Sequence, residues 1–210
     1  VERRRRQKVV FDMRYDFIEI GTSNFETIAS EGHEGLAGIC VEPVKHYLNQ
    51  IPERTNIKKL NAAIVENFSE KKTFIHYIPE EVIDERKMPE WMKGCNSIQA
   101  PHPHHERYLD LVEKDEVDVY SFSQLVDMFN IENAEFIKVD TEGCDIGIAI
   151  SILKEVKKTN KKFFPKTIRF EASPFDFSPY NYTYEIVGLA KEIGYNLSFH
   201  DRDGILRDIL

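Results

Sequence analysis

A glycine turn followed about twenty residues later by a carboxylate is the first pattern in this sequence with chemical meaning. The segment Glu19–Phe25 runs from an apolar stretch into Gly21, and the segment Val41–Pro43 ends the next apolar stretch. Glycine permits a tight turn and close approach of a ligand to the backbone, and the start of a helix offers free N–H groups. A carboxylate after the second strand can accept hydrogen bonds from both ribose hydroxyls of a nucleotide-type ligand. The predicted ligand contacts are Glu19, Gly21, Thr22, Ser23, Asn24, Glu42 and Pro43.

Two ligands satisfy this pair of motifs, a nicotinamide dinucleotide and S-adenosylmethionine. The full G-x-G-x-x-G pattern lets a pyrophosphate approach the helix N-terminus, whereas Asn24 and Phe25 fill part of that space here. A ligand without phosphate is accommodated more easily, which favours S-adenosylmethionine. Two simpler explanations stay open: an ordinary strand-to-helix turn, and a carboxylate at Glu42 that only stabilises a helix start through the helix dipole.

A second acidic motif, Asp140-Thr141-Glu142-Gly143, follows the apolar stretch Ala134–Val139. Asp140 is expected beside the glycine turn, where it could hold the ammonium group of the methyl donor, orient an acceptor hydroxyl or ligate a divalent cation. Glu142 could do the same from the turn. The alternative is that the pair only caps the helix that begins at Asp145.

Histidines gather in the segment Pro101-His102-Pro103-His104-His105. Methylation of a hydroxyl requires loss of its proton, and a histidine with a pKa near ~6.5 is a suitable base. One of His102, His104 and His105 on a lid would serve, and we regard His102 and His104 as the first candidates, with an exposed polar loop as the alternative. A metal site formed by a histidine, Asp140 and Glu171 is a further option, in which magnesium or manganese would prefer the carboxylates.

Aromatic residues cluster late in the chain, between Phe163 and Tyr184. Core packing accounts for such residues in most proteins, but those near strand ends could form a platform for a sugar or another flat acceptor. Residues 173–182 contain two prolines and follow Glu171, so they are predicted to form a wall of the acceptor site.

Strands and helices alternate along the chain, which predicts an α/β fold with a mainly parallel sheet and a C-terminal antiparallel hairpin. Ligands in such sheets bind at the carboxyl ends of the strands. Residues 79–116, rich in proline, are expected to form an irregular lid or acceptor-side insertion. The predicted strands are 17–20, 38–41, 57–65, 73–78, 117–120, 134–139, 166–170, 195–199 and 205–209. The predicted helices are 24–36, 44–50, 121–130, 145–158 and 182–193.

Length and composition fit one α/β domain in an intracellular setting. The chain has 210 residues and a formal net charge of -8, which disfavours a broad nucleic-acid surface. Three scattered cysteines indicate no disulfide framework and favour a reducing, cytoplasmic setting, and no apolar run is long enough to span a bilayer. Residues 1–14, with the run Arg3–Arg6, are interpreted as a basic lead-in or linker from a longer parent chain, and residues 15–210 as the enzyme domain.

The order of these motifs resembles the FkbM-type methyltransferase family. The segments that carry the resemblance are Phe17–Gly21, Val41–Pro43, Asn61–Ile64, Ile137–Gly143 and Gly194-Tyr195. The resemblance implies a class I, Rossmann-like three-layer methyltransferase fold and S-adenosylmethionine as donor. It also implies that the Gly21 turn takes the methionine part, Glu42 the ribose, and Ala62 and Ala63 the adenine. The family usually has Asp at the position of Glu19 and Gly at that of Phe25.

We therefore expect transfer of a methyl group to a hydroxyl, with Asp140 as the first catalytic candidate and His102 or His104 as base. Since many relatives act on sugars, the resemblance implies a sugar hydroxyl of a glycan or glycoside, and the parent chain is expected to carry further domains, such as a glycosyltransferase. Two alternatives stay open: an NAD-dependent oxidoreductase and a non-catalytic binding module with this fold.

Overall fold

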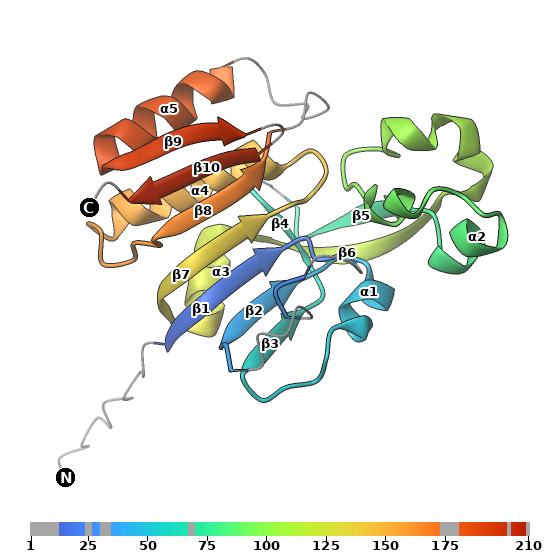
Figure 1. Cartoon of the computed structure of the whole chain (residues 1–210), viewed down its shortest axis with the longest axis horizontal. Helices are drawn as coiled ribbons and strands as arrows, with labels where there is room; N and C mark the ends of the chain where they lie inside the picture. The colour runs from blue at the N-terminus through green and yellow to red at the C-terminus, as the bar shows by residue number, and fades with distance from the viewer. Residues whose placement is uncertain are drawn as a thin grey trace, which may run out of the picture.

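The computed structural model describes residues 13–23, 27–29, 35–66, 70–172, 181–200 and 203–208. A seven-stranded sheet with the order β3-β2-β1-β7-β8-β10-β9 forms its centre (Figure 1). The strands from β3 to β8 in this order are parallel, and β10 lies antiparallel to both β8 and β9. The strands are β1 (Met13–Ile20), β2 (Gly38–Val41), β3 (Ile57–Leu60), β7 (Ile131–Val139), β8 (Thr167–Glu171), β9 (Tyr195–His200) and β10 (Asp203–Asp208). The predicted α/β fold with a C-terminal antiparallel hairpin is confirmed.

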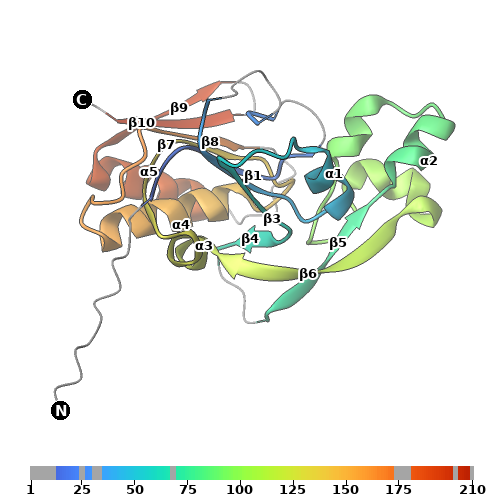
Figure 2. The same ribbon diagram turned by 90° about the horizontal axis from the view of Figure 1, so that it is seen from below.

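Apolar residues on both faces explain why the central strands are parallel and buried. All four residues of β2 are buried, as expected for a strand covered on each side. Ile18 of β1 and Ile137 of β7 pair in register and contact the side covered by helices α3, α4 and α5 (Figure 2). Phe17 and Cys40 point to the other face, where they pack with Leu48 of helix α1.

The helices agree with their sequence signals. Helix α3 (Phe122–Phe129) begins with a capping box formed by Ser121 and Gln124 and ends at Asn130 in the left-handed conformation. The other long helices are α4 (Asp145–Lys158) and α5 (Asn181–Ile193), and α1 (Lys45–Gln50) is short. Within the predicted helix 24–36, the described residues are not helical: residues 28, 29 and 35 form turns, and residues 27 and 36 have no regular structure. Residues 24–26 and 30–34 lie outside the described parts.

The predicted single strand 57–65 is wrong, because the chain leaves the large sheet after Leu60. The side chain of Asn61 donates to the carbonyls of Glu42 and Pro43, which fastens the departing backbone to the end of β2. The chain then forms β4 (Ala63–Val65) in a second sheet with the order β4-β6-β5. Its other strands are β5 (Lys72–Tyr77) and β6 (Glu113–Ser121).

The segment between β5 and β6 lies beyond the carboxyl ends of the central strands (Figure 1). It contains the short helix α2 (Glu80–Glu85) and two 3₁₀ segments, η1 (Glu90–Gly94) and η2 (Pro103–Leu111). The sequence predicted an irregular insertion at residues 79–116, but residues 113–116 belong to β6, so we refer to residues 79–112 as the insertion. No helix in the described ranges has the length and apolarity needed to cross a bilayer.

Candidate active site

A cavity opens at the carboxyl ends of β1, β2 and β7, between the large sheet and the insertion. Its empty space amounts to about 480 Å³, including the part open to solvent. Its lining contains seven of the ten predicted cofactor residues: Gly21, Ser23, Glu42, Pro43, Ala62, Ala63 and Asp140. Glu19 and Thr22 are not part of this lining, and Asn24 lies outside the described residues. The sequence did not predict the lining residues Ile75, Gly94, Asn96, Ile98 and Thr141.

Only glycine fits at the turn after β1. Gly21 has φ +79, and a Cβ added there would lie 1.8 Å from the carbonyl oxygen of Asp140. This close approach results from strand pairing, because the Asp140 N–H donates to the carbonyl of Ile20 at 2.9 Å. Gly21 therefore brings the first turn against the acidic turn after β7.

The Glu42 carboxylate shapes the glycine turn from inside the protein. One oxygen accepts from the N–H groups of Thr22 and Ser23, each at 2.9 Å, and the other accepts from the Val44 N–H at 2.8 Å. Glu42 is only 3% exposed; burial raises its pKa, and these N–H groups oppose that rise. The structure brings Glu42 to the cavity, as the sequence predicted, and gives it this second role in holding the turn.

Glu19 is buried behind the cavity rather than in its lining. Its carboxylate accepts from the Ile28 N–H at 3.1 Å and lies 3.4 Å from Lys138 Nζ, which is also 3.4 Å from the Asp140 carboxylate. Burial raises the pKa of Glu19 to about 7, although Lys138 and the Ile28 N–H act in the opposite direction. Glu19 therefore binds the backbone at Ile28, after the glycine turn, and Lys138 lies between its carboxylate and that of Asp140.

Asp145 fastens the acidic turn after β7. Its carboxylate accepts from the Thr141 N–H at 2.8 Å and from the Gly143 N–H at 3.2 Å. Asp145 thus holds in place the turn that carries Asp140 and Glu142. The Asp140 side chain is 44% exposed at the cavity mouth, and Glu142 adopts φ 52 in the turn.

The histidines of the insertion occupy different surroundings. His102 is 5% exposed, with Nε2 3.2 Å from a carboxylate oxygen of Glu142, and its Nδ1 accepts from the His104 N–H at 3.2 Å. The His104 N–H thus holds Nδ1, while Nε2 faces the Glu142 carboxylate. His104 is exposed, and its ring centroid lies 4.8 Å from that of Trp91. His105 is fully buried, and burial together with His102 lowers its pKa to about 4.

Asp140, Glu142 and Glu171 converge, each offering an oxygen within 4.8 Å of the others. These are the ligands that magnesium prefers, and they are equally suited to accept hydrogen bonds from an ammonium or from hydroxyls. A second group contains Cys95, His102 and Glu142. A cation on His102 Nε2 would force the ring proton onto Nδ1, opposite the His104 N–H, so this second group is poorly suited to a metal.

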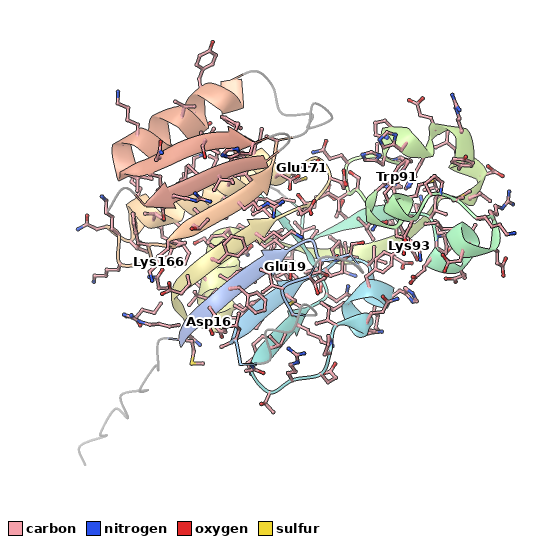
Figure 3. The ribbon with its side chains drawn as sticks, in the orientation of Figure 1. Asp16, Glu19, Trp91, Lys93, Lys166 and Glu171 are labelled. Atoms are coloured by element: carbon pink, nitrogen blue, oxygen red, sulfur yellow. The ribbon has the colours of Figure 1, made fainter. Side chains whose placement is uncertain are left out.

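Figure 3 places Glu171 at the edge of the large sheet that faces the insertion, where Trp91 and Lys93 lie, while Asp16 and Lys166 mark the opposite edge. The late aromatic residues differ in exposure: Tyr184, for example, is exposed. Phe163 and Phe170 are buried in the core, which excludes them from an acceptor platform. The predicted acceptor wall at residues 173–182 lies, apart from the first residues of α5, outside the described parts.

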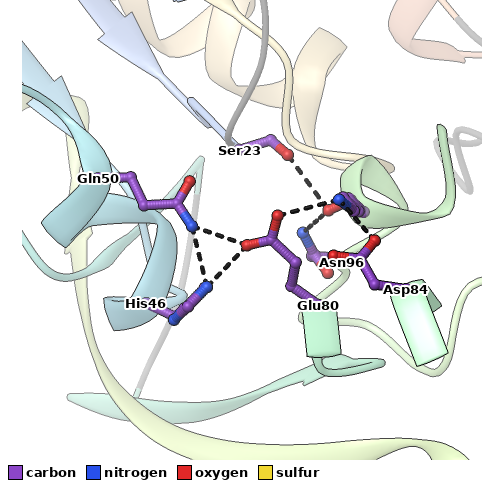
Figure 4. A network of polar contacts seen from close by, with 7 residues as sticks. Ser23, His46, Gln50, Glu80, Asp84 and Asn96 are labelled. Atoms are coloured by element: carbon purple, nitrogen blue, oxygen red, sulfur yellow. Dashed lines mark hydrogen bonds and ion pairs between the residues drawn. The ribbon is translucent and has the colours of Figure 1, made fainter. Parts of the chain in front are cut away.

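A polar network that the sequence did not predict joins the insertion to the glycine turn (Figure 4). The Lys93 ammonium lies 3.0 Å from Glu80 and 2.9 Å from Asp84, both on α2. The Lys93 backbone carbonyl accepts hydrogen bonds from Ser23 Oγ at 3.2 Å and from Asn96 Nδ2 at 2.8 Å. Lys93 therefore fixes the position of the insertion against the cavity, and we call these contacts the Lys93 latch.

Glu80 extends the latch to α1. It accepts from Gln50 Nε2 at 2.7 Å and lies 2.8 Å from His46 Nε2. Partial burial favours the neutral acid, but hydrogen bonds from His46, Lys93 and Gln50 outweigh it and lower the pKa of Glu80 to about 2. The latch is thus assembled around an ionised carboxylate.

The strand order, the glycine turn and the cavity at the carboxyl ends define a Rossmann-like methyltransferase fold. Comparison with protein-family models matched the methyltransferase FkbM domain over residues 19–197. The chain belongs to this family and is a methyltransferase domain. The parallel searches of curated proteins and of solved structures found no match.

Proposed function

We propose that this domain transfers a methyl group from S-adenosylmethionine to a hydroxyl of a sugar in a glycan or glycoside. The observation that carries the proposal is the cavity between Gly21 and Glu42, with the exposed carboxylate of Asp140 at its mouth. The family supports methyl transfer, and the donor, the hydroxyl acceptor and the sugar are our inferences from it and from the site.

The lining of the cavity fits the donor. Ala62, Ala63 and Ile64 offer a small apolar wall suited to adenine, and Glu42 is the candidate partner of the ribose. The hydroxyl of Thr141 is buried with no hydrogen-bond partner among the described residues, so a polar ligand group would satisfy it. Together these residues would hold S-adenosylmethionine.

The same turn disfavours the alternative of a nicotinamide dinucleotide. A pyrophosphate needs the free N–H groups of the glycine turn. Here the N–H groups of Thr22 and Ser23 are bound to Glu42, whose carboxylate would repel a phosphate. A ligand that bears a sulfonium and an ammonium avoids this conflict, which supports a methyltransferase over an oxidoreductase.

When bound, S-adenosylmethionine supplies a reactive methyl group, so the protein's main contribution is alignment and removal of the acceptor proton. Asp140 is the first candidate to bind the acceptor hydroxyl and take its proton, because its carboxylate is exposed beside the turn. Glu142 and Glu171 can accept hydrogen bonds from neighbouring hydroxyls. His102 lies beside Glu142, and the exposed His104 is the more accessible of the two candidate bases.

The acceptor assignment has support at the cavity mouth. Asp140 lies there, and the carboxylate oxygens of Asp140, Glu142 and Glu171, within 4.8 Å of one another, suit a polyhydroxylated molecule. We place the reaction in a reducing, cytoplasmic setting because Cys40, Cys95 and Cys144 form no disulfide. Fusion to other domains, such as a glycosyltransferase, is part of the same proposal.

The test is transfer of isotopically labelled methyl from S-adenosylmethionine to a panel of glycosides, followed by product analysis. Asp140→Asn should lower kcat by about 100-fold or more, the usual contribution of a group that handles a proton. The exposed Asp127 on α3 provides the control, and Asp127→Asn should leave kcat unchanged. Donor binding without turnover on any hydroxyl acceptor would point to a non-catalytic module instead.

A further inference from the structure

Asn96 is a buried amide with one unused polar atom beside the cavity. Its side chain is 8% exposed, and it contributes to the cavity lining. Oδ1 is buried and has no hydrogen-bond partner among the residues that the structure describes. Leaving a buried amide oxygen unpaired is unfavourable, so such an atom at a ligand cavity indicates that a ligand group forms its hydrogen bond.

The orientation of the amide is fixed by the protein. Asn96 Nδ2 donates to the Lys93 carbonyl at 2.8 Å, and the reverse orientation would place two oxygens against each other. The Lys93 carbonyl also accepts from Ser23 Oγ, and the Lys93 ammonium is held by Glu80 and Asp84. The latch therefore directs Oδ1 before any ligand binds.

We propose that Asn96 is a donor-binding residue whose Oδ1 accepts a hydrogen bond from an N–H group of the methyl donor. The inference rests on the proposed function. An amide oxygen can only accept hydrogen bonds. The carboxylate of S-adenosylmethionine, which also only accepts, is therefore excluded as its partner. With Glu42 assigned to the ribose hydroxyls, two N–H groups of the donor remain, the α-ammonium and the 6-amino group of adenine.

Both N–H groups of the methyl donor, the α-ammonium and the 6-amino group, agree with the surroundings of Asn96. The link through Lys93 to Ser23 places Asn96 near the glycine turn, where the methionine part is expected. Ile75 and Ile98 in the same lining extend the apolar wall, where adenine is expected. Each group would donate an N–H hydrogen bond to Oδ1. Ligand analogues that lack one group or the other show which of the two is the partner.

The experiment is calorimetric titration of the wild-type protein and Asn96→Ala with three ligands. S-adenosylhomocysteine carries both N–H groups, 5′-methylthioadenosine lacks the α-ammonium, and S-inosylhomocysteine has a carbonyl in place of the 6-amino group. Asn96→Ala should weaken S-adenosylhomocysteine binding by about tenfold, the effect of one buried hydrogen bond. If the ammonium is the partner, 5′-methylthioadenosine will be insensitive to the substitution; if the amine is the partner, S-inosylhomocysteine will be insensitive.

Two further variants separate ligand binding from a structural role. Asn96→Asp keeps an acceptor oxygen but loses the bond to Lys93, so it should retain more affinity than Asn96→Ala; equal losses would indicate a purely structural role. Asn196→Ala, at an exposed position on β9, should change nothing.

Equal affinities of the wild-type protein and folded Asn96→Ala for S-adenosylhomocysteine would overturn the inference, as would equal sensitivity of all three ligands. Failure of the wild-type protein to bind S-adenosylhomocysteine would instead reject the proposed function, and this inference with it.

Discussion

At the scale of single residues, Gly21 sets the strictest steric condition on the site. Its φ is +79, and a Cβ would lie 1.8 Å from the Asp140 carbonyl oxygen, so any side chain must displace the backbone of one turn. We expect Gly21→Ala to destabilise the fold by at least about 2 kcal/mol and to abolish donor binding. Urea unfolding and calorimetry with S-adenosylhomocysteine measure the two effects.

Gly188 on α5 provides a matched control. A Cβ there meets nothing within 4 Å, and the position is exposed in a helix. Gly188→Ala should therefore stabilise the fold by about 0.5–1 kcal/mol and leave donor binding intact. If Gly21→Ala behaved in the same way, the close contact of the two turns would not be a requirement of the site.

The cavity residues that could be predicted from the sequence share one property, because each of them follows a buried strand. Gly21, Glu42 and Asp140 could be found because parallel strands bring their carboxyl ends to one edge. Asn96 and Lys93 lie in the insertion, where no periodic pattern links them to the turns that they contact. Ser23 lies 70 positions from Lys93 along the chain, and contacts at such separations leave no local signal.

At the scale of elements, the Lys93 latch joins α1, α2 and η1 around one ionised carboxylate. The pKa of Glu80 is lowered to about 2 from 4.5, so its ionisation stabilises the folded state above pH 4.5. This contribution is lost as the pH falls from about 4.5 towards 2. Because Glu80 is 18% exposed, we expect about 2 kcal/mol rather than the full effect of the shift.

The Glu80→Gln variant tests the direction of this pH dependence of stability. Urea unfolding should show the variant to be less stable than the wild-type protein at pH 7, with the difference shrinking as the pH is lowered from 4.5 to 3. Glu81→Gln, exposed at the next position of the same helix, should be neutral at both ends of the range. A difference that does not depend on pH would show that the charge of Glu80 is not what stabilises the latch.

Most element boundaries could be predicted because their signals are local. The capping box at Ser121 and the left-handed Asn130 enclose α3, and the apolar spacing of α4 gave its span. The division of residues 57–65 between two sheets could not be predicted in this way. It depends on the contact of Asn61 with the end of β2, a tertiary interaction that an unbroken apolar run conceals.

At the scale of the whole molecule, the donor joins parts that are distant in sequence. The large sheet, the small sheet and the insertion all contribute residues to the cavity, so the donor should stabilise the whole fold. At a concentration about 100 times its Kd, a ligand adds about 2.7 kcal/mol. For a domain of this size that corresponds to a Tm increase of about 5–10 °C.

Thermal unfolding measured with and without S-adenosylhomocysteine checks this expectation. NAD at the same concentration should leave the Tm unchanged, because Glu42 occupies the N–H groups that a pyrophosphate requires. A larger shift with NAD than with S-adenosylhomocysteine would favour the oxidoreductase.

A crystal structure with bound S-adenosylhomocysteine tests the central claim most directly. The account predicts density for the ligand between Gly21 and Glu42, with its sulfur towards the side on which the Asp140 carboxylate is exposed. Density for the ligand at another place on the protein, with this cavity left to solvent at saturating ligand, would contradict it.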